Sequence, residues 1–214
     1  MRFRTTLIAS GLAGGVAVIL LGVGINALGN GPLAIDTWWH DLMLTWRTES
    51  WLAVALAFDV VGGVTAMTVI GIVIVVGFLA ARRPWDALTV TAAMLTSQAI
   101  TGVLKVSFAR PRPPDSLVTD AMTSFPSGHT TLAATVMVVL ALLIRADAMW
   151  LAAVLWVMAM AWSRTYLSAH WLTDVSAGAV LGASVAVLVW AVIADLRRAV
   201  QQHALIAAND LSAT

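Results

Sequence analysis

The stretch Phe125-Pro126-Ser127-Gly128-His129-Thr130 stands immediately before a long apolar run, and its composition predicts a turn that enters a helix. Ser127 is a favourable cap residue, because its hydroxyl can accept a hydrogen bond from one of the unpaired backbone N–H groups. The other N–H groups and the helix dipole favour an anion such as phosphate, to which His129 could transfer a proton. Taken alone, the stretch also fits a membrane helix that carries a histidine by chance.

The composition around this stretch is that of a membrane protein. Apolar residues make up 60% of the 214 residues, charged residues make up 11%, and the mean hydropathy is +0.91. Soluble domains contain about 25% charged residues. A spanning helix needs about 20 mostly apolar residues. Of six charge-free windows, four meet or approach that length, while the fourth and fifth are short, so their flanking charged residues are expected near the membrane surface. The six windows are residues 5–35, 60–81, 87–104, 130–144, 148–163 and 175–194.

We therefore expect an all-α polytopic membrane protein, with one domain over residues 1–214 and six transmembrane helices. A short helix over residues 35–46 is expected to lie in the membrane interface, because its tryptophans recur at helical spacing. Residues 201–214 form a polar tail in which little order is expected. The chain has no cysteine, which excludes disulfides, thiol nucleophiles and cysteine-ligated metals. The net charge of +1 gives no indication of nucleic-acid binding, and none is predicted.

The distribution of cations predicts the orientation in the membrane. Six spans place both termini on one side, and cytoplasmic termini would put seven of the twelve lysines and arginines inside. Three of the five outer cations belong to a candidate site, so the remaining bias is seven against two. The positive-inside rule then favours a plasma-membrane protein with cytoplasmic termini and an extracytoplasmic site.

Alternate connections of the six helices bring several polar residues to that outer face. They are Lys105, Arg112, Ser127, Gly128, His129, Arg164, His170 and Asp174. Taken singly, Lys105 and Arg164 could be interfacial anchors, and His170 with Asp174 could be a satisfied polar pair. Taken together, three cations, two histidines and a carboxylate at one membrane face are costly, which favours a functional site.

Phosphoryl transfer is the chemistry that suits this set. Lys105, Arg112 and Arg164, with Ser127 and the Gly128 N–H, could bind the phosphate oxygens and stabilise their developing charge. We expect His170 to be the nucleophile, because Asp174 lies one helical turn later and can hold its far ring N–H. His129 has no evident carboxylate neighbour in the sequence, and we expect it to be the general acid.

Three motifs in this order resemble the signature of the type-2 phosphatidic acid phosphatase family, which shares its site with vanadium-dependent haloperoxidases. They run from Lys105 to Arg112-Pro113, over Pro126-Ser127-Gly128-His129, and from Ser163-Arg164 through His170 to Asp174. No key position is substituted. The resemblance implies a metal-independent lipid phosphatase that needs no cofactor and works through a phosphohistidine. The haloperoxidase branch is soluble and needs vanadate, so the predicted spans argue against it.

The substrate implied is a lipid phosphate at headgroup depth. Undecaprenyl pyrophosphate is the expected substrate, with phosphatidylglycerol phosphate or phosphatidate as alternatives within the same class. A different class of protein would be a transporter or lipid-binding protein that holds the anion without cleaving it. The pair of His170 and Asp174 argues for catalysis, because binding alone needs no oriented nucleophile.

Overall fold

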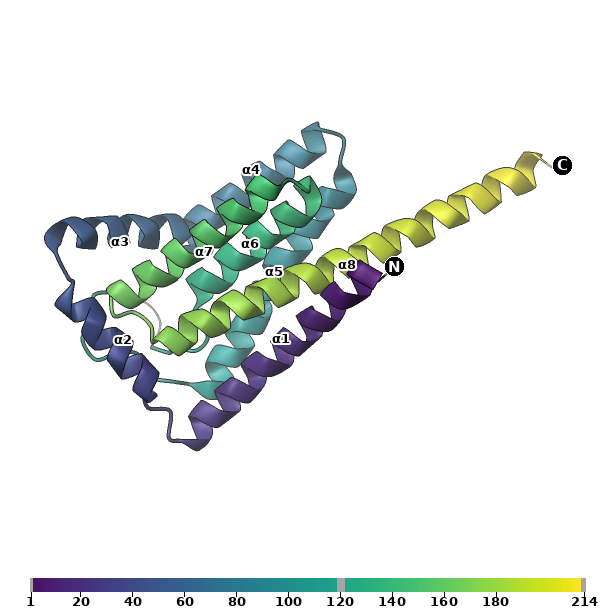
Figure 1. The fold of residues 1–214 in the computed structure, drawn as a ribbon. Helices are drawn as coiled ribbons and strands as arrows, with labels where there is room; N and C mark the ends of the chain where they lie inside the picture. The colour runs from purple at the N-terminus through teal and green to yellow at the C-terminus, as the bar shows by residue number, and fades with distance from the viewer. Residues whose placement is uncertain (1, 119–121, 213–214) are drawn as a thin grey trace.

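The computed structural model describes residues 2–118 and 122–212, and in these residues it contains eight helices and no strand. Figure 1 shows their arrangement, with the two termini at the same side of the bundle. The helices are α1 (Arg2–Ala27), α2 (Ala34–Thr45), α3 (Glu49–Gly62), α4 (Val64–Ala80), α5 (Pro84–Phe108), α6 (Gly128–Ile144), α7 (Asp147–Tyr166) and α8 (Leu172–Ser212). The prediction of an all-helical fold is therefore confirmed.

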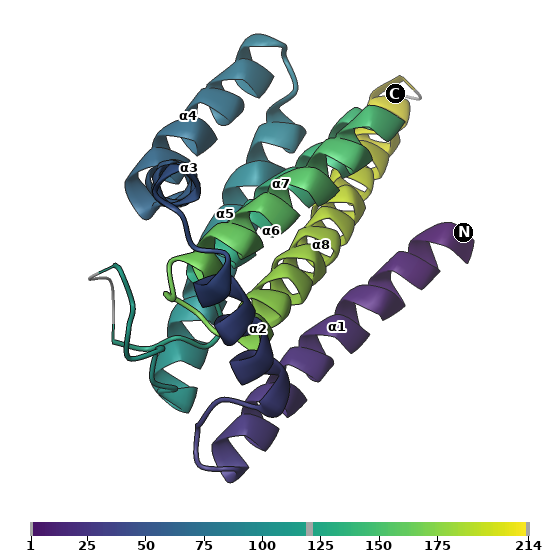
Figure 2. The same cartoon turned by 60° about the vertical axis from the view of Figure 1, so that its left-hand side comes forward.

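The helices that are long and apolar enough to cross a membrane are α1, α5, α7 and α8. Helices α3 and α4 give a fifth candidate if they count as one span that is bent by 55°. Figure 2 views α3 nearly end-on, whereas the neighbouring α4 runs obliquely across the view. Helix α6 is apolar but has only 17 residues. A polytopic membrane protein is thus supported, while the count of six spans and the interfacial position of α2 stay predictions.

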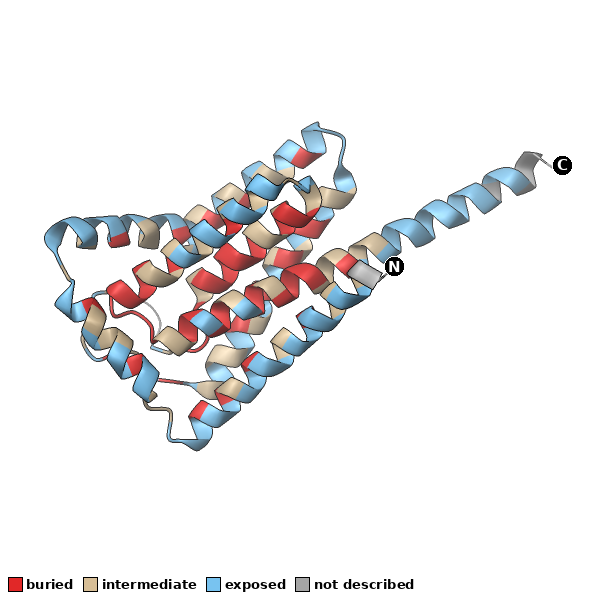
Figure 3. Cartoon of the chain, viewed as in Figure 1, coloured by how far each residue is buried: buried red, intermediate tan, exposed pale blue. Residues whose placement is uncertain are grey.

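Helix α6 lies at the centre of the bundle. All residues from Thr130 to Val136 are buried, and Figure 3 shows buried positions concentrated along α6 and the first half of α8. The hydroxyls on this buried helix are satisfied within it: Thr131 Oγ1 donates to the Ser127 carbonyl over 2.8 Å, and Thr135 Oγ1 donates to the Thr131 carbonyl over 2.8 Å. The outer faces of α1, α3 and α4 are exposed and apolar, as expected for helices in contact with lipid.

Two glycines on α8 let this helix approach α6 closely. A Cβ atom on Gly178 would lie 2.7 Å from the Ser127 carbonyl oxygen, and a Cβ on Gly182 would overlap the Thr131 carbonyl oxygen. Gly178 and Gly182 are four residues apart, so both face α6, in the small-xxx-small spacing of packed membrane helices. This contact fixes the start of α8 against the start of α6, where the candidate site lies.

The expectation of a loosely ordered tail is wrong for the residues that the structure describes. Helix α8 continues without interruption to Ser212, well beyond the last apolar window. Residues 195–212 contain no glycine or proline, and many of them are alanine, leucine, glutamine or arginine, which favour helices. Residues 213 and 214 lie outside the described part of the chain.

Candidate active site

A cavity of about 540 Å³ opens where α3, α5 and α6 meet the turn between α7 and α8. Five of the eight predicted site residues line it: Lys105, Arg112, Gly128, His129 and His170. The other three lie behind the cavity wall and are fully buried: Ser127, Arg164 and Asp174. The structure therefore brings the predicted residues to one place, as the alternate connections of the helices require.

The start of α6 forms one wall of this cavity. Ser127 is its N-cap residue, as predicted, and its backbone N–H donates to the Asp174 carbonyl over 3.1 Å. The prediction that the Ser127 hydroxyl accepts a hydrogen bond from a backbone N–H of the helix is wrong. Ser127 Oγ instead accepts a hydrogen bond from Thr130 Oγ1 over 3.2 Å. No side-chain cap bond is present at this N-terminus, so the hydroxyl does not compete with an anion for the helix N–H groups.

Two of the predicted cations are held by backbone carbonyls. Lys105, in the last turn of α5, donates from Nζ to the Thr123 carbonyl over 2.9 Å. Arg112 donates from Nη1 to the Ala169 carbonyl over 3.1 Å. The segment after α5 begins at Ala109 in the left-handed conformation, with φ of 47°. These contacts hold both side chains at the cavity, which they line.

Asp59 is a site residue that the sequence analysis missed. Its carboxylate pairs with Arg164, and Asp59 Oδ1 lies 3.4 Å from His129 Nε2. The expectation that His129 has no carboxylate neighbour is therefore wrong. The neighbour comes from α3, far earlier in the chain, and a negative charge at this distance stabilises a protonated imidazole.

The break between α3 and α4 allows this contact. A Cβ on Gly62 would lie 3.1 Å from His129 Cδ2 and 2.7 Å from Met160 Sδ, so a larger residue there would require both side chains to shift. The sequence held a signal: Asp59 is the only charged residue between residues 50 and 81, and a charge in such a segment marks a functional site.

The predicted pair of His170 and Asp174 is brought together, but without a hydrogen bond. His170 Nδ1 lies 3.7 Å from Asp174 Oδ2, and this buried nitrogen has no hydrogen-bond partner among the described residues. Asp174 Oδ2 accepts from the Trp171 backbone N–H over 2.9 Å. The carboxylate thus faces the ring nitrogen that it was expected to hold, while its strong hydrogen bonds go elsewhere.

Those strong bonds involve Arg110, a second residue that the sequence analysis left out of the site. Arg110 is fully buried and donates to Asp174 Oδ1 over 2.6 Å and to Asp36 Oδ2 over 2.7 Å. Asp36 belongs to α2 and also accepts from the Thr173 backbone N–H over 2.8 Å. The buried Asp36–Arg110–Asp174 group therefore ties α2 and α8 to the segment that carries Arg112.

The environment of His170 favours its neutral form. The turn that carries it lies between α7 and α8, and the residue is 2% exposed. Burial lowers the pKa of His170 well below its usual 6.5, and the charges of Arg164, Arg112, Lys105 and His129 lower it further. A neutral imidazole has the free lone pair that a nucleophile needs. Among the described residues, no group of three or more metal-ligating side chains is found.

These features define a helical membrane protein with a cationic cavity that is lined by two histidines. The model of the PAP2 superfamily matches residues 86–198, more than half of the chain, and the protein belongs to this superfamily. The match begins after Asp36 and Asp59, so both carboxylates come from the part of the chain outside it. No protein in the curated set matches the sequence.

Two crystal structures share the fold. One is a transmembrane PAP2-type phosphatidylglycerolphosphate phosphatase from Bacillus subtilis, with a TM-score of 0.75 and 26% identity over 84% of this chain and 94% of that chain. The other is Aquifex aeolicus LpxE, with a TM-score of 0.65 and 22% identity over 74% of this chain and 96% of that chain. Similarity thus extends from the matched region to most of the bundle.

Proposed function

We propose that this protein is a membrane lipid phosphatase that cleaves its substrate through a phosphohistidine on His170. One observation carries the proposal: His129 and His170 line the same cavity as Lys105 and Arg112. Two histidines and two cations around one space match a phosphoryl group flanked by a nucleophile and a proton donor. Membership of the PAP2 superfamily supports the same chemistry.

The reaction follows from these positions in two steps. Because Asp174 faces Nδ1 of His170, the attacking atom is Nε2, which forms a P–N bond as the bond to the leaving oxygen breaks. His129 gives its proton to that oxygen, while Lys105, Arg112 and Arg164 stabilise the charge on the other phosphate oxygens. Water then attacks the phosphohistidine, and His129 takes the proton that the water loses. Inorganic phosphate leaves and both histidines return to their starting states.

We propose that this chemistry needs no metal and no cofactor. The positions where a metallophosphatase gathers carboxylates around its ions are filled here by Lys105 and Arg112. The guanidinium and ammonium groups supply the positive charge that a metal would otherwise supply to the phosphoryl group.

An adjoining cavity supports a lipid substrate. It has a volume of about 370 Å³, lies between α4 and α5, and is lined mainly by apolar side chains such as Ile72, Val75 and Leu95. Gln98 and Leu132 line both this cavity and the candidate active site. A lipid chain could lie there while its phosphate occupies the cationic space, whereas a water-soluble phosphate would gain nothing from the apolar part.

We propose undecaprenyl pyrophosphate as the substrate, at a site on the extracytoplasmic side of the plasma membrane. Phosphatidylglycerol phosphate is the second candidate, favoured by the likeness to the Bacillus subtilis phosphatidylglycerolphosphate phosphatase at 26% identity. Phosphatidate is a further member of the same class. The alternative from a different class is a protein that binds or transports a lipid phosphate without cleaving it.

Phosphate release from these three lipids by the purified protein in mixed micelles tests both levels of the proposal. The expected result is release from all three, with the highest kcat/KM for undecaprenyl pyrophosphate, and none by the His170→Ala variant. A higher kcat/KM for phosphatidylglycerol phosphate would establish the second candidate. Lipid binding without phosphate release from any of them would show a binding protein or transporter and refute the enzyme.

A further inference from the structure

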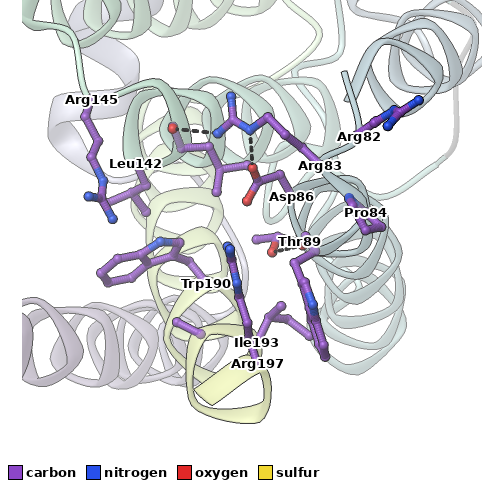
Figure 4. Close-up of a pocket in the computed structure, with 13 residues that line it drawn as sticks. Arg82, Arg83, Pro84, Asp86, Thr89, Leu142, Arg145, Trp190, Ile193 and Arg197 are labelled. Atoms are coloured by element: carbon purple, nitrogen blue, oxygen red, sulfur yellow. Dashed lines mark hydrogen bonds and ion pairs between the residues drawn. The ribbon is translucent and has the colours of Figure 1, made fainter. Parts of the chain in front are cut away.

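A second polar cavity lies at the end of the bundle opposite to the candidate active site (Figure 4). It has a volume of about 510 Å³ and is formed by the turn between α4 and α5, the end of α6 and the middle of α8. Thr89 lines this cavity and Lys105 lines the candidate active site, and along α5 they are separated by about 24 Å. The second cavity is therefore a separate site.

Positive charge dominates its lining. Four arginines and one aspartate line the cavity: Arg82, Arg83, Arg145, Arg197 and Asp86. The side chain of Arg82 points away from it, and the other four residues have a formal charge of +2. The single carboxylate is already engaged, because Asp86 accepts from Arg83 Nε over 2.5 Å. Arg83 also donates from Nη2 to the Leu143 carbonyl over 3.1 Å, which holds it in place.

Two of the arginines have no acidic partner in the described part of the chain. Arg145 and Arg197 form no ion pair there, and the nearest carboxylate along α8, Asp195, is paired with Arg4 and Arg198 instead. Figure 4 shows Arg197 extending towards the middle of the cavity between Trp190 and Thr89, whereas Arg82 points away from it. Their charges are thus left for an anion that is not part of the protein.

The backbone supports this interpretation. Arg145, whose side chain is part of the proposed site, has the left-handed conformation, with φ of 59°. Positions just after a helix in this conformation are usually glycine or asparagine, because a Cβ atom makes it unfavourable. A general excess of cations at one end of the bundle would explain arginines there, but it requires neither this conformation nor a shared cavity.

An adjoining hollow distinguishes a lipid from a soluble anion. A cavity of about 450 Å³ continues from the first past Leu142, Arg145 and Trp190, and it is also lined by Ala141 and Trp150. Tryptophans at such a position are typical of the level of lipid headgroups. An amphipathic ligand could therefore place its phosphate among the arginines and its first acyl carbons against the indole rings.

We propose that this pair of cavities binds the phosphodiester headgroup of an anionic phospholipid from the leaflet at that end of the bundle. Arg83, Arg145 and Arg197 contact the phosphate, and Trp150, Trp190 and Leu142 contact the start of the acyl chains. The bound lipid is not the substrate of the candidate active site, since a phosphodiester lacks the terminal phosphate that the two histidines would remove.

Native mass spectrometry of the full chain in detergent, titrated with phosphatidylglycerol or phosphatidylcholine, tests the proposal. The test variant is Arg145→Asn/Arg197→Gln, in which asparagine tolerates the left-handed backbone. The matched control is Arg198→Gln, which removes the same charge one residue away but leaves the cavity lining unchanged. Inorganic phosphate is added in a competition arm, to separate a lipid site from a site for free phosphate.

We expect the unaltered protein to retain phosphatidylglycerol in preference to phosphatidylcholine. Each arginine near a membrane contributes a factor of about five to binding of anionic lipid, so the double variant should bind about 25-fold more weakly. Arg197→Gln alone should bind about fivefold more weakly, which keeps the test available if the double variant does not fold. Arg198→Gln should bind as the unaltered protein does.

Three results would overturn the proposal. The first is equal weakening by Arg197→Gln and Arg198→Gln, which would show a diffuse effect of charge. The second is equal retention of the two lipids by the unaltered protein. The third is displacement of phosphatidylglycerol by inorganic phosphate at equal concentration, which would show a site for the free anion.

Discussion

Replacing Asp59 by asparagine removes one negative charge beside His129 and Arg164 and leaves the size of the side chain unchanged. The carboxylate oxygen lies 3.4 Å from His129 Nε2. If His129 gives a proton to the leaving oxygen, the charge on Asp59 keeps that proton available and holds the ring in position. The Asp59→Asn variant should therefore show the same kind of defect as a variant without the proton donor His129, but to a smaller extent.

The magnitude follows from the distance and the exposure. Two unit charges 3.4 Å apart interact by about 1 kcal/mol in bulk water and by about 5 kcal/mol at an effective dielectric constant of about 20. The side chains of His129 and Asp59 are 16% and 21% exposed, which places the pair between these limits. Asparagine keeps a polar contact, so we expect a loss of about 1.4–2.7 kcal/mol, or about 10- to 100-fold in kcat.

The assay compares two leaving groups. On phosphatidate, whose alkoxide needs a proton to leave, Asp59→Asn should lower kcat by about 10- to 100-fold. On nitrophenyl phosphate, whose phenolate leaves without a proton, the loss should be less than about threefold. Asp41→Asn, the same change at an exposed position of α2, is the control and should alter neither rate. Equal losses on both substrates would mean that Asp59 acts through Arg164 on phosphate binding, and would refute the link to His129.

Four further outcomes are expected. Arg110→Met leaves two buried carboxylates without their cation, and should lower the free energy of unfolding in mixed micelles by about 3–5 kcal/mol; a loss below about 1 kcal/mol would contradict the role of this group. The ring of His170 should stay neutral below pH 6.5 in NMR titration, since burial and neighbouring cations lower its pKa. Only the unfolded chain then gains this proton as the pH falls through about 6.5, so His170 should make the protein less stable on acidification; a titration midpoint at or above 6.5 would be the opposite result. Phosphate release should be unchanged in excess chelator, and a loss that Mg²⁺ restores would disprove metal independence. A cysteine at Ser116 should react with an impermeant thiol reagent in intact cells and one at Ala146 should not; the reverse pattern would invert the proposed orientation.

The sequence was sufficient to predict those residues of the candidate site that lie near helix ends. Lys105 lies in the last turn of α5, Gly128 begins α6, and His170 lies in the turn between α7 and α8. In a bundle of membrane helices, alternate turns lie at the same end, so connectivity alone places these residues together. Their spacing along the chain was then enough to identify the motifs.

Residues whose partners come from distant helices could not be predicted from connectivity. Asp59 reaches His129 only because the chain breaks at Gly63, between α3 and α4, and a bend of 55° cannot be deduced from two glycines. Arg110 and Arg112 look alike in the sequence, and only the fold brings Asp36 and Asp174 to the first of them. Tertiary contacts decide both cases, whereas local propensity decides neither.

Each of the two histidines lies beside a carboxylate that pairs with an arginine, and this changes the basis on which their roles are assigned. His129 faces Asp59, which pairs with Arg164, and His170 faces Asp174, which pairs with Arg110. The sequence analysis assigned the nucleophile by its carboxylate neighbour. This criterion does not distinguish the two histidines, because each of them has one.

The environment distinguishes them instead. His170 has a side chain that is 1% exposed and lies 3.7 Å from the carboxylate of Asp174, which pairs with the buried Arg110. His129 is 16% exposed, opens on the cavity and lies 3.4 Å from a carboxylate that is itself partly exposed. Burial among cations favours the neutral ring that we propose attacks phosphorus. His129 opens on the cavity, where it can give its proton to the leaving oxygen. The proposed division of roles thus rests on how deeply each histidine is buried.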